Sequence, residues 1–203
     1  MKKAGQLNLG PSTLEGKYVR MEPLRMRHRD ALYEAAKRLD WKWFLEPLLT
    51  KEDVRKRILH GLRSERRNEA YAFAVKMRRG SRVVGSTSYM TIVQGYKRAE
   101  VGSTWYAPDV WGTVVNPECK YLLFRHAFED WGAVRIQLVT DEHNLHSQRA
   151  ISKLGAKFEG RLRNYGIRPD GSYRTSMVYS ITSEEWPGVK AGLSRRITAF
   201  SGG

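Results

Sequence analysis

Cysteine is nearly absent from this sequence of 203 residues, which contains only Cys119. A lone cysteine excludes an intrachain disulfide and a metal site built from several thiolates, and it is typical of a reducing compartment. The sequence also lacks any run of the roughly 18 apolar residues that a membrane-spanning helix needs. Its first residues, Met1 to Gln6, lack the apolar core of a secretory signal peptide. We therefore expect a cytoplasmic protein with no membrane partner.

Internal repeats, low-complexity tracts and linkers rich in proline and glycine are absent between residues 14 and 186. The composition is 41% hydrophobic and 28% charged, which is typical of a folded chain rather than a disordered one. A length of 203 residues suits one compact domain. We expect this domain at residues 14–186, with flexible tails at residues 1–13 and 187–203.

Acidic residues are scarce relative to basic ones. The chain has 36 lysines and arginines against 21 aspartates and glutamates, a net charge of +15 that is spread over both halves. Such a field attracts nucleic acids or other polyanionic ligands without specifying either. The distribution also fits an ordinary solvated basic surface, so composition alone leaves both interpretations open.

The hydrophobic period switches repeatedly between that of a strand and that of a helix. Thr50 and Asp53 have the spacing of a capping box, Asn116 and Pro117 are typical of a helix start, and Gly132 of a helix end. The patterns predict strands at residues 17–21, 71–77, 82–93, 98–106, 134–140, 157–168 and 173–181, and helices at residues 30–39, 50–62, 116–131 and 144–154. This order predicts a mixed α/β sheet in which residues 71–106 form an antiparallel meander.

Two of these helices begin directly after a strand. A helix N-terminus there presents unpaired backbone N–H groups and the positive end of the helix dipole, which together bind anions. The loop from Trp111 to Asn116 precedes one helix, with Lys120 one turn inside it, and residues 141–147 precede the other. Most helices begin in this way, so without further context an ordinary capped connection is favoured over an anion site.

Several motifs resemble the GNAT superfamily of acetyl-CoA-dependent N-acetyltransferases, in the branch of the Rim ribosomal-protein acetyltransferases. They are Val83-Val84-Gly85, Glu100-Val101-Gly102 with Trp105, Trp111-Gly112, and the run Asp141-x-x-Asn144-x-x-Ser147-x-x-Ala150-Ile151-x-x-Leu154-Gly155-Ala156-x-x-Glu159-Gly160. The resemblance implies a largely antiparallel twisted sheet with about four helices. It also implies that the strands at residues 98–106 and 134–141 splay apart to hold the pantetheine arm.

The resemblance implies acetyl-CoA as co-substrate. We expect no metal, because His143, His146 and Asp141 do not form a helical two-histidine motif. Its phosphate loop falls on Trp111, Gly112, Thr113, Val114, Val115 and Asn116, and Ser103, Thr104, Trp105, Lys120, Asn144 and Ser147 complete the implied cofactor site. Val114 and Asn116 depart from the family, which has small residues there. We favour a slightly different loop path with Asn116 as the helix cap over weakened binding.

The resemblance also implies the catalytic groups. Ile151 stands where many relatives carry an acidic tyrosine, so Ser147 becomes the candidate donor to the leaving thiolate. A backbone N–H near Ser103 would stabilise the oxyanion. Candidates for the base are Glu100, His143, His146, Glu159 and Tyr165, among which we select Glu100. The aromatic residues Trp41, Trp43 and Phe44 fit either the core or the lip of the acceptor site.

These residues predict an N-acetyltransferase that acts by direct attack of a primary amine, either a protein N-terminus, ribosomal ones included, or a small molecule. The alternative is a non-catalytic RNA- or ribosome-binding module on a degenerate fold of this kind, which the +15 charge and the altered loop favour. Ribosome association and a homodimer stay open.

Overall fold

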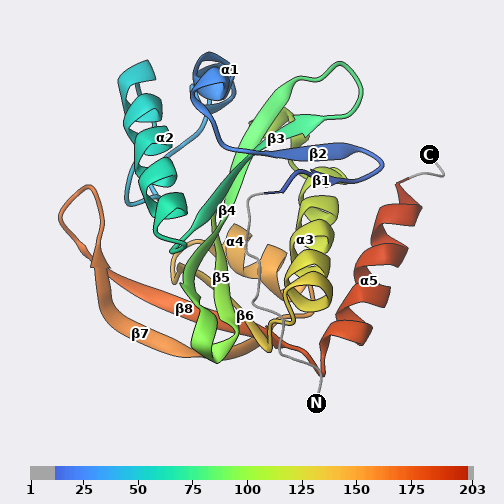
Figure 1. Cartoon of the computed structure of the whole chain (residues 1–203). Helices are drawn as coiled ribbons and strands as arrows, with labels where there is room; N and C mark the ends of the chain where they lie inside the picture. Colours follow the sequence, from blue (N-terminus) through green and yellow to red (C-terminus); the bar gives the residue numbers. More distant parts are fainter. Residues whose placement is uncertain (1–11, 201–203) are drawn as a thin grey trace.

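One eight-stranded sheet organises the computed structural model, which describes residues 12–200 (Figure 1). Its order is β1-β2-β3-β4-β5-β6-β8-β7, and every neighbouring pair is antiparallel except β5 with β6. The strands are β1 Leu14–Glu15, β2 Val19–Pro23, β3 Tyr71–Met77, β4 Val83–Val93, β5 Arg98–Tyr106, β6 Arg135–Asp141, β7 Lys157–Ile167 and β8 Tyr173–Thr182. The predicted mixed sheet and its antiparallel meander, β3 to β5, are confirmed.

Helices cover both faces of this sheet. They are α1 Arg29–Ala36, α2 Lys51–Arg66, α3 Val115–Arg125, α4 Leu145–Ser152 and α5 Trp186–Ala199, with shorter helical segments at Met26–His28, Gln94–Tyr96, Pro108–Val110 and His126–Asp130. One apolar cluster joins the sheet to α3, α4 and α5, and a second joins it to α1 and α2. The sheet is therefore the middle layer between two helical layers.

The capping box of α2 forms as predicted. The hydroxyl of Thr50 accepts the N–H of Asp53 at 3.1 Å, and the Asp53 carboxylate accepts the N–H of Thr50 at 2.8 Å. These reciprocal bonds satisfy backbone donors that a helix start otherwise leaves unpaired. Val54 and Ile58 then lie on the buried side of α2, where they anchor it to the sheet.

The C-terminal region corrects one expectation. Residues 187–203 were predicted to be a flexible tail, but α5 occupies most of them and packs on α3 (Figure 1). The rings of Trp186 and Phe128 stack with centroids 5.4 Å apart, and Leu193 is buried. Pro187 lies in the first turn of α5, where a helix needs no backbone N–H from its residues. Of the expected N-terminal tail, residues 1–13, all but the last two lie outside the described residues.

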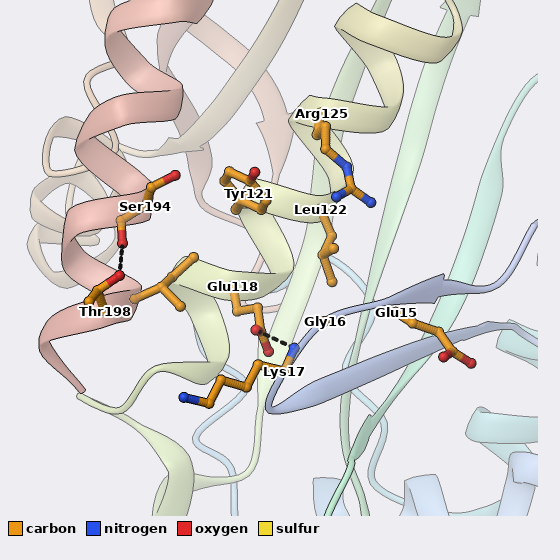
Figure 2. Close-up of a pocket in the computed structure, with 10 residues that line it drawn as sticks. Glu15, Gly16, Lys17, Glu118, Tyr121, Leu122, Arg125, Ser194 and Thr198 are labelled. Carbon is orange, nitrogen blue, oxygen red and sulfur yellow. Dashed lines mark hydrogen bonds between the residues drawn. The ribbon is translucent and has the colours of Figure 1, made fainter. Parts of the chain in front are cut away.

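A buried carboxylate attaches α3 to the N-terminal hairpin. Glu118 accepts the backbone N–H groups of Lys17, Tyr18 and Val19 at 2.8, 2.8 and 2.7 Å. Figure 2 shows the first of these bonds beside a pocket of about 380 Å³ that none of the predicted site residues lines. A Cβ atom at Gly16 would lie 2.5 Å from Glu118 Cδ, so only glycine fits this close approach.

Candidate functional site

The parallel strands β5 and β6 separate partway along their length. They pair over only three residues each, and the last pair is Glu100 with Gln137. Beyond that pair β5 continues to Tyr106 on β4, while β6 continues to Asp141 on β8. The predicted splayed pair is confirmed. Its diverging segments leave backbone groups on both strands without a partner strand, so the gap can accept an extended ligand.

A β-bulge shapes β5 inside this gap. Ser103 has a φ of +48°, in the left-handed region, and the β4–β5 register shifts beside it. Such bulges bend a strand and redirect its side chains, often next to active sites. Arg57 of α2 donates a hydrogen bond to the Ser103 hydroxyl, which ties this helix to the bulge. The predicted segment Ser103, Thr104 and Trp105 therefore lies on the diverging part of β5.

The predicted phosphate loop connects β5 to the start of α3. The helix begins at Val115 with Val114 as its N-cap, so the prediction that Asn116 caps it is wrong. Asn116 and Pro117 are its second and third residues, since the buried side chains of Val114 and Val115 draw the chain into the core two residues earlier. The N-cap side chain makes no capping bond.

Four backbone N–H groups of this loop donate no hydrogen bond to any described residue. They belong to Gly112, Thr113, Val114 and Asn116. Gly112 has a φ of +73° and no atom within 4 Å of an added Cβ, so the loop is open there. Free donors at a helix N-terminus are the chemistry that a phosphate requires. The loop thus fits an anion despite its departures from the family pattern.

Lys120 does not point to the open loop. It is 4% exposed, and its Nζ donates to Thr104 Oγ1 at 2.8 Å, beneath the diverging part of β5. Thr104 Oγ1 in turn lies 2.7 Å from Thr87 Oγ1. Burial lowers the pKa of Lys120 to about 8, and the described residues contain no carboxylate within salt-bridge distance of it. Lys120 is therefore a buried cation under the gap rather than a surface clamp.

The second predicted junction begins α4 at the open end of β6. Asn144 is the N-cap, and its Oδ1 accepts the backbone N–H of Ser147 at 2.9 Å. The two N–H donors of the Asn144 amide make no bond to a described residue, and neither does the Ser147 hydroxyl. Both side chains are half-buried. The structure thus places two unengaged polar groups at this helix start.

Ring contacts bring these segments together. Trp111 of the phosphate loop lies against His146 of α4, with ring centroids 5.7 Å apart. Trp43, from the connection between α1 and α2, lies 6.4 Å from the ring of His143. The two helix starts are therefore neighbours across the gap, and the α1–α2 connection reaches the same place.

Glu100 lies at the closed end of the gap. Its side chain is half-buried. This burial raises its pKa, although a hydrogen bond from Gln137 and the charge of Arg174 oppose that rise. The Gln137 amide donates to Glu100 Oε2 at 3.3 Å. A carboxylate with a raised pKa is suited to take a proton near neutral pH.

The predicted aromatic lip is divided between core and surface. Trp41 is buried and packs on Trp105 at 5.5 Å, and Phe44 packs on Trp41 at 4.9 Å. Only Trp43 extends toward the gap through its contact with His143. The first two therefore support the wall from behind.

The other base candidates are less well placed. Glu159 is held by Arg135 at 2.6 Å, and an ion pair of that kind keeps its pKa low. Tyr165 is exposed.

Burial raises the pKa of Cys119 to about 12, so this thiol is not a nucleophile at neutral pH. No group of three metal-binding side chains occurs within residues 12–200, and none of their helices is long and apolar enough to cross a bilayer.

Sequence reasoning missed an ionic cluster beside the gap. Asp141, at the end of β6, accepts two bonds from Arg168 at 2.7 and 3.0 Å and the N–H of His143 at 2.9 Å. Arg174 of β8 lies 3.8 Å from the same carboxylate. Only the strand register brings these residues together, so no local pattern could have predicted the cluster.

Comparison with known proteins agrees with this geometry. The GNAT acetyltransferase domain model matches residues 19–157. A Bacillus subtilis (strain 168) protein named uncharacterized N-acetyltransferase YoaA is 28% identical over 109 residues, which span 54% of this chain and 60% of that relative.

Solved structures give a wider match. A candidate acetyltransferase from T. thermophilus is 36% identical with a TM-score of 0.82, covering 92% of this chain and 97% of that one. A GCN5-related N-acetyltransferase from Brucella melitensis is 26% identical, with a TM-score of 0.84 over 91% and 85% of the two chains. Mycobacterium smegmatis RimJ, solved with CoA-disulfide, shares the fold at 20% identity and a TM-score of 0.76, covering 91% of this chain and 94% of that one. With its splayed strands and two helix starts, this chain belongs to the GNAT acetyltransferase family.

Proposed function

We propose that this protein is an acetyl-CoA-dependent N-acetyltransferase that transfers an acetyl group to a primary amine. The observation that carries the proposal is the gap between β5 and β6, because a helix N-terminus lies at the open end of each strand. Membership in the GNAT acetyltransferase family supports the same activity. The acceptor is a small-molecule amine or a protein N-terminus. The sequence resemblance to the Rim ribosomal-protein acetyltransferases keeps ribosomal N-termini among the candidates.

The chain's own groups would hold the cofactor at three points. The free N–H groups around Gly112 and Thr113 bind the pyrophosphate. The diverging backbone of β5 bonds the pantetheine arm as a neighbouring strand would. The amide of Asn144 donates to the same arm from α4.

Transfer requires a neutral amine, a stabilised oxyanion and a protonated leaving group. Glu100 takes a proton from the incoming ammonium, directly or through a water, because burial makes its carboxylate a stronger base. A backbone N–H of the Ser103 bulge donates to the thioester oxygen, where negative charge develops as the C–N bond forms. Ser147 donates a proton to the thiolate as the C–S bond breaks, and its oxygen takes up, directly or through a water, the second proton that the amine nitrogen loses as it becomes an amide.

The direct test follows free thiol release from acetyl-CoA with a panel of primary amines. We expect amine-dependent release, and Glu100→Gln should lower kcat by about 100-fold while acetyl-CoA affinity changes little. Glu52→Gln is the matched control, since Glu52 is exposed on α2 and, within residues 12–200, pairs only with Arg55. Failure to bind acetyl-CoA, or thiol release that ignores the amine, contradicts the proposed function. Equal losses in both variants contradict the role of Glu100.

A further inference from the structure

One face of the sheet carries both Glu100 and a second conspicuous charge. Glu100 pairs with Gln137, Gln137 pairs with Ser180, and Asp141 pairs with Ser176. Side chains alternate along a strand, so Arg174, two residues from Ser176, projects from the same face of the sheet. That face lies opposite α3, on the side where α1 and α2 pack (Figure 1).

The side chain of Arg174 is only 14% exposed, yet it donates no hydrogen bond to any residue within 12–200. Its Nε is fully buried without a partner. A guanidinium has five N–H donors, and buried donors are ordinarily satisfied. Arg168, buried to a similar degree, bonds to Asp141, Ser172 and Tyr173. Of these two arginines, only Arg174 lacks a hydrogen-bond partner among the described residues.

Two carboxylates, Asp141 and Glu100, attract this arginine, but neither accepts a hydrogen bond from it. Asp141 is 3.8 Å away, too far for a hydrogen bond, and two bonds from Arg168 already occupy its oxygens. Glu159 on the same hairpin is held by Arg135 through bonds of 2.6 Å to each oxygen. A buried charge of this kind is costly unless a ligand supplies the opposite charge.

The location of Arg174 matches the acceptor side of the site. Its positive charge acts on Glu100, the proposed base, and lowers the pKa of that carboxyl against the effect of burial. A Cβ atom at Gly166 would lie 3.7 Å from Leu45 and 3.9 Å from Arg174, so Arg174 is next to the α1–α2 connection. Trp43 of that connection reaches the gap. An acceptor whose amine lies at Glu100 therefore lies next to Arg174 as well.

We propose that Arg174 binds a carboxylate of the acceptor, so that the preferred substrates are amines of the amino-acid type. This inference rests on the proposed acetyl transfer and names its substrate class. The planar guanidinium accepts a carboxylate through two parallel bonds, which gives both affinity and orientation. A site built for that bond rejects an analogue without the carboxylate, because its own buried donors are then left unpaired.

The test compares each of several free amino acids with its primary amide and its decarboxylated amine. We expect wild-type kcat/KM to favour the carboxylate by about 100-fold, and Arg174→Met to reduce that preference to less than about 3-fold. Arg174→Lys should keep an intermediate preference, since it retains the charge and loses the two-pronged geometry. Arg163→Met is the matched control because Arg163 is an exposed arginine of the same β7–β8 hairpin. It should retain the wild-type preference.

Calorimetry with N-acetylated amino acids and their methylamides, on protein saturated with CoA, tests the same contact without turnover. Only the carboxylates should bind wild type, and Arg174→Met should lose them while its melting temperature is maintained. Equal turnover of amines with and without a carboxylate overturns the inference but leaves acetyl transfer intact. Absence of carboxylate binding overturns it whatever the activity. A preference confined to C-terminally amidated peptides that begin with Asp or Glu would mean that Arg174 binds the side-chain carboxylate of a protein's first residue. That result would overturn the inference that free amino acids are the preferred substrates.

Discussion

Ser147 illustrates how one hydroxyl can be assigned a catalytic role at the residue scale. Its backbone N–H is committed to Asn144, whereas its hydroxyl bonds to no described residue and lies at the start of α4. We predict that Ser147→Ala lowers kcat by about 10- to 100-fold and changes the Kd for acetyl-CoA less than 3-fold, because proton donation matters only once the thiolate forms. Steady-state kinetics with calorimetry checks this. Parallel losses of kcat and affinity would make Ser147 a binding residue.

Lys120 gives a second prediction at this scale. Its pKa in the folded protein, about 8, lies below the ordinary value of 10.5, so the folded state releases this proton first as pH rises. The unfolded state then binds more protons, and stability must increase with pH across that interval. Wild type should gain roughly 2 kcal/mol of unfolding free energy relative to Lys120→Met between pH 7 and pH 10.

Urea denaturation at several pH values measures this difference. Lys56→Met, at an exposed position of α2, is the control and should follow the wild-type pH dependence. A constant difference between wild type and Lys120→Met would mean that Lys120 titrates normally, and its burial beneath the gap would then be wrong.

The sequence predicted the residues of the two junctions but not what their side chains contact. Asn144 and Ser147 stand at a helix start because spacing and capping chemistry are local properties. Lys120 was expected to face a phosphate. The sequence gives its position along the helix but not the direction in which its side chain points from the helix axis. Arg174 was not predicted as a site residue. What distinguishes it is a buried guanidinium without hydrogen-bond partners among the described residues, and no sequence pattern indicates that.

At the scale of elements, α5 is a helix that the sequence did not predict, because its first residues include Pro187 and Gly188, which are typical of loops. Leu193 is 1% exposed in the cluster that joins α5 to the sheet. We predict that Leu193→Ala lowers the unfolding free energy by about 2 to 4 kcal/mol through loss of buried surface and the cavity left behind. Arg195→Ala, exposed on the same helix, should change it by less than about 0.5 kcal/mol. If both substitutions changed the unfolding free energy equally little, residues 187–199 would not pack on the domain, and the expectation of a flexible tail would be right.

The strands were easier to predict than the helix boundaries. The meander of β3, β4 and β5 follows from alternating residues and turn signals, which depend on neighbours in sequence. The N-cap of α3 was misplaced by two residues because Asn116 carries a strong capping signal. Burial of Val114 and Val115 outweighed that signal, and burial is a tertiary effect. The splayed pair came from the family resemblance and not from any local pattern.

At the scale of the whole molecule, the net charge of +15 can now be tested against a particular ligand. A positive field attracts the phosphates of acetyl-CoA over a distance that salt shortens. We predict that KM for acetyl-CoA rises several-fold between roughly 50 and 300 mM NaCl while kcat changes less than about 2-fold. Steep, salt-dependent binding of RNA without affinity for acetyl-CoA would instead favour the nucleic-acid module.

A crystal structure of the protein soaked with acetyl-CoA shows whether the gap between β5 and β6 holds this ligand. We expect the pyrophosphate on the N–H groups around Gly112 and Thr113, the pantetheine arm between the two strands, and the thioester between the Ser103 bulge and Ser147. Acetyl-CoA bound outside the gap, or no binding at saturating concentration, would overturn the assignment of the gap as the acetyl-CoA site.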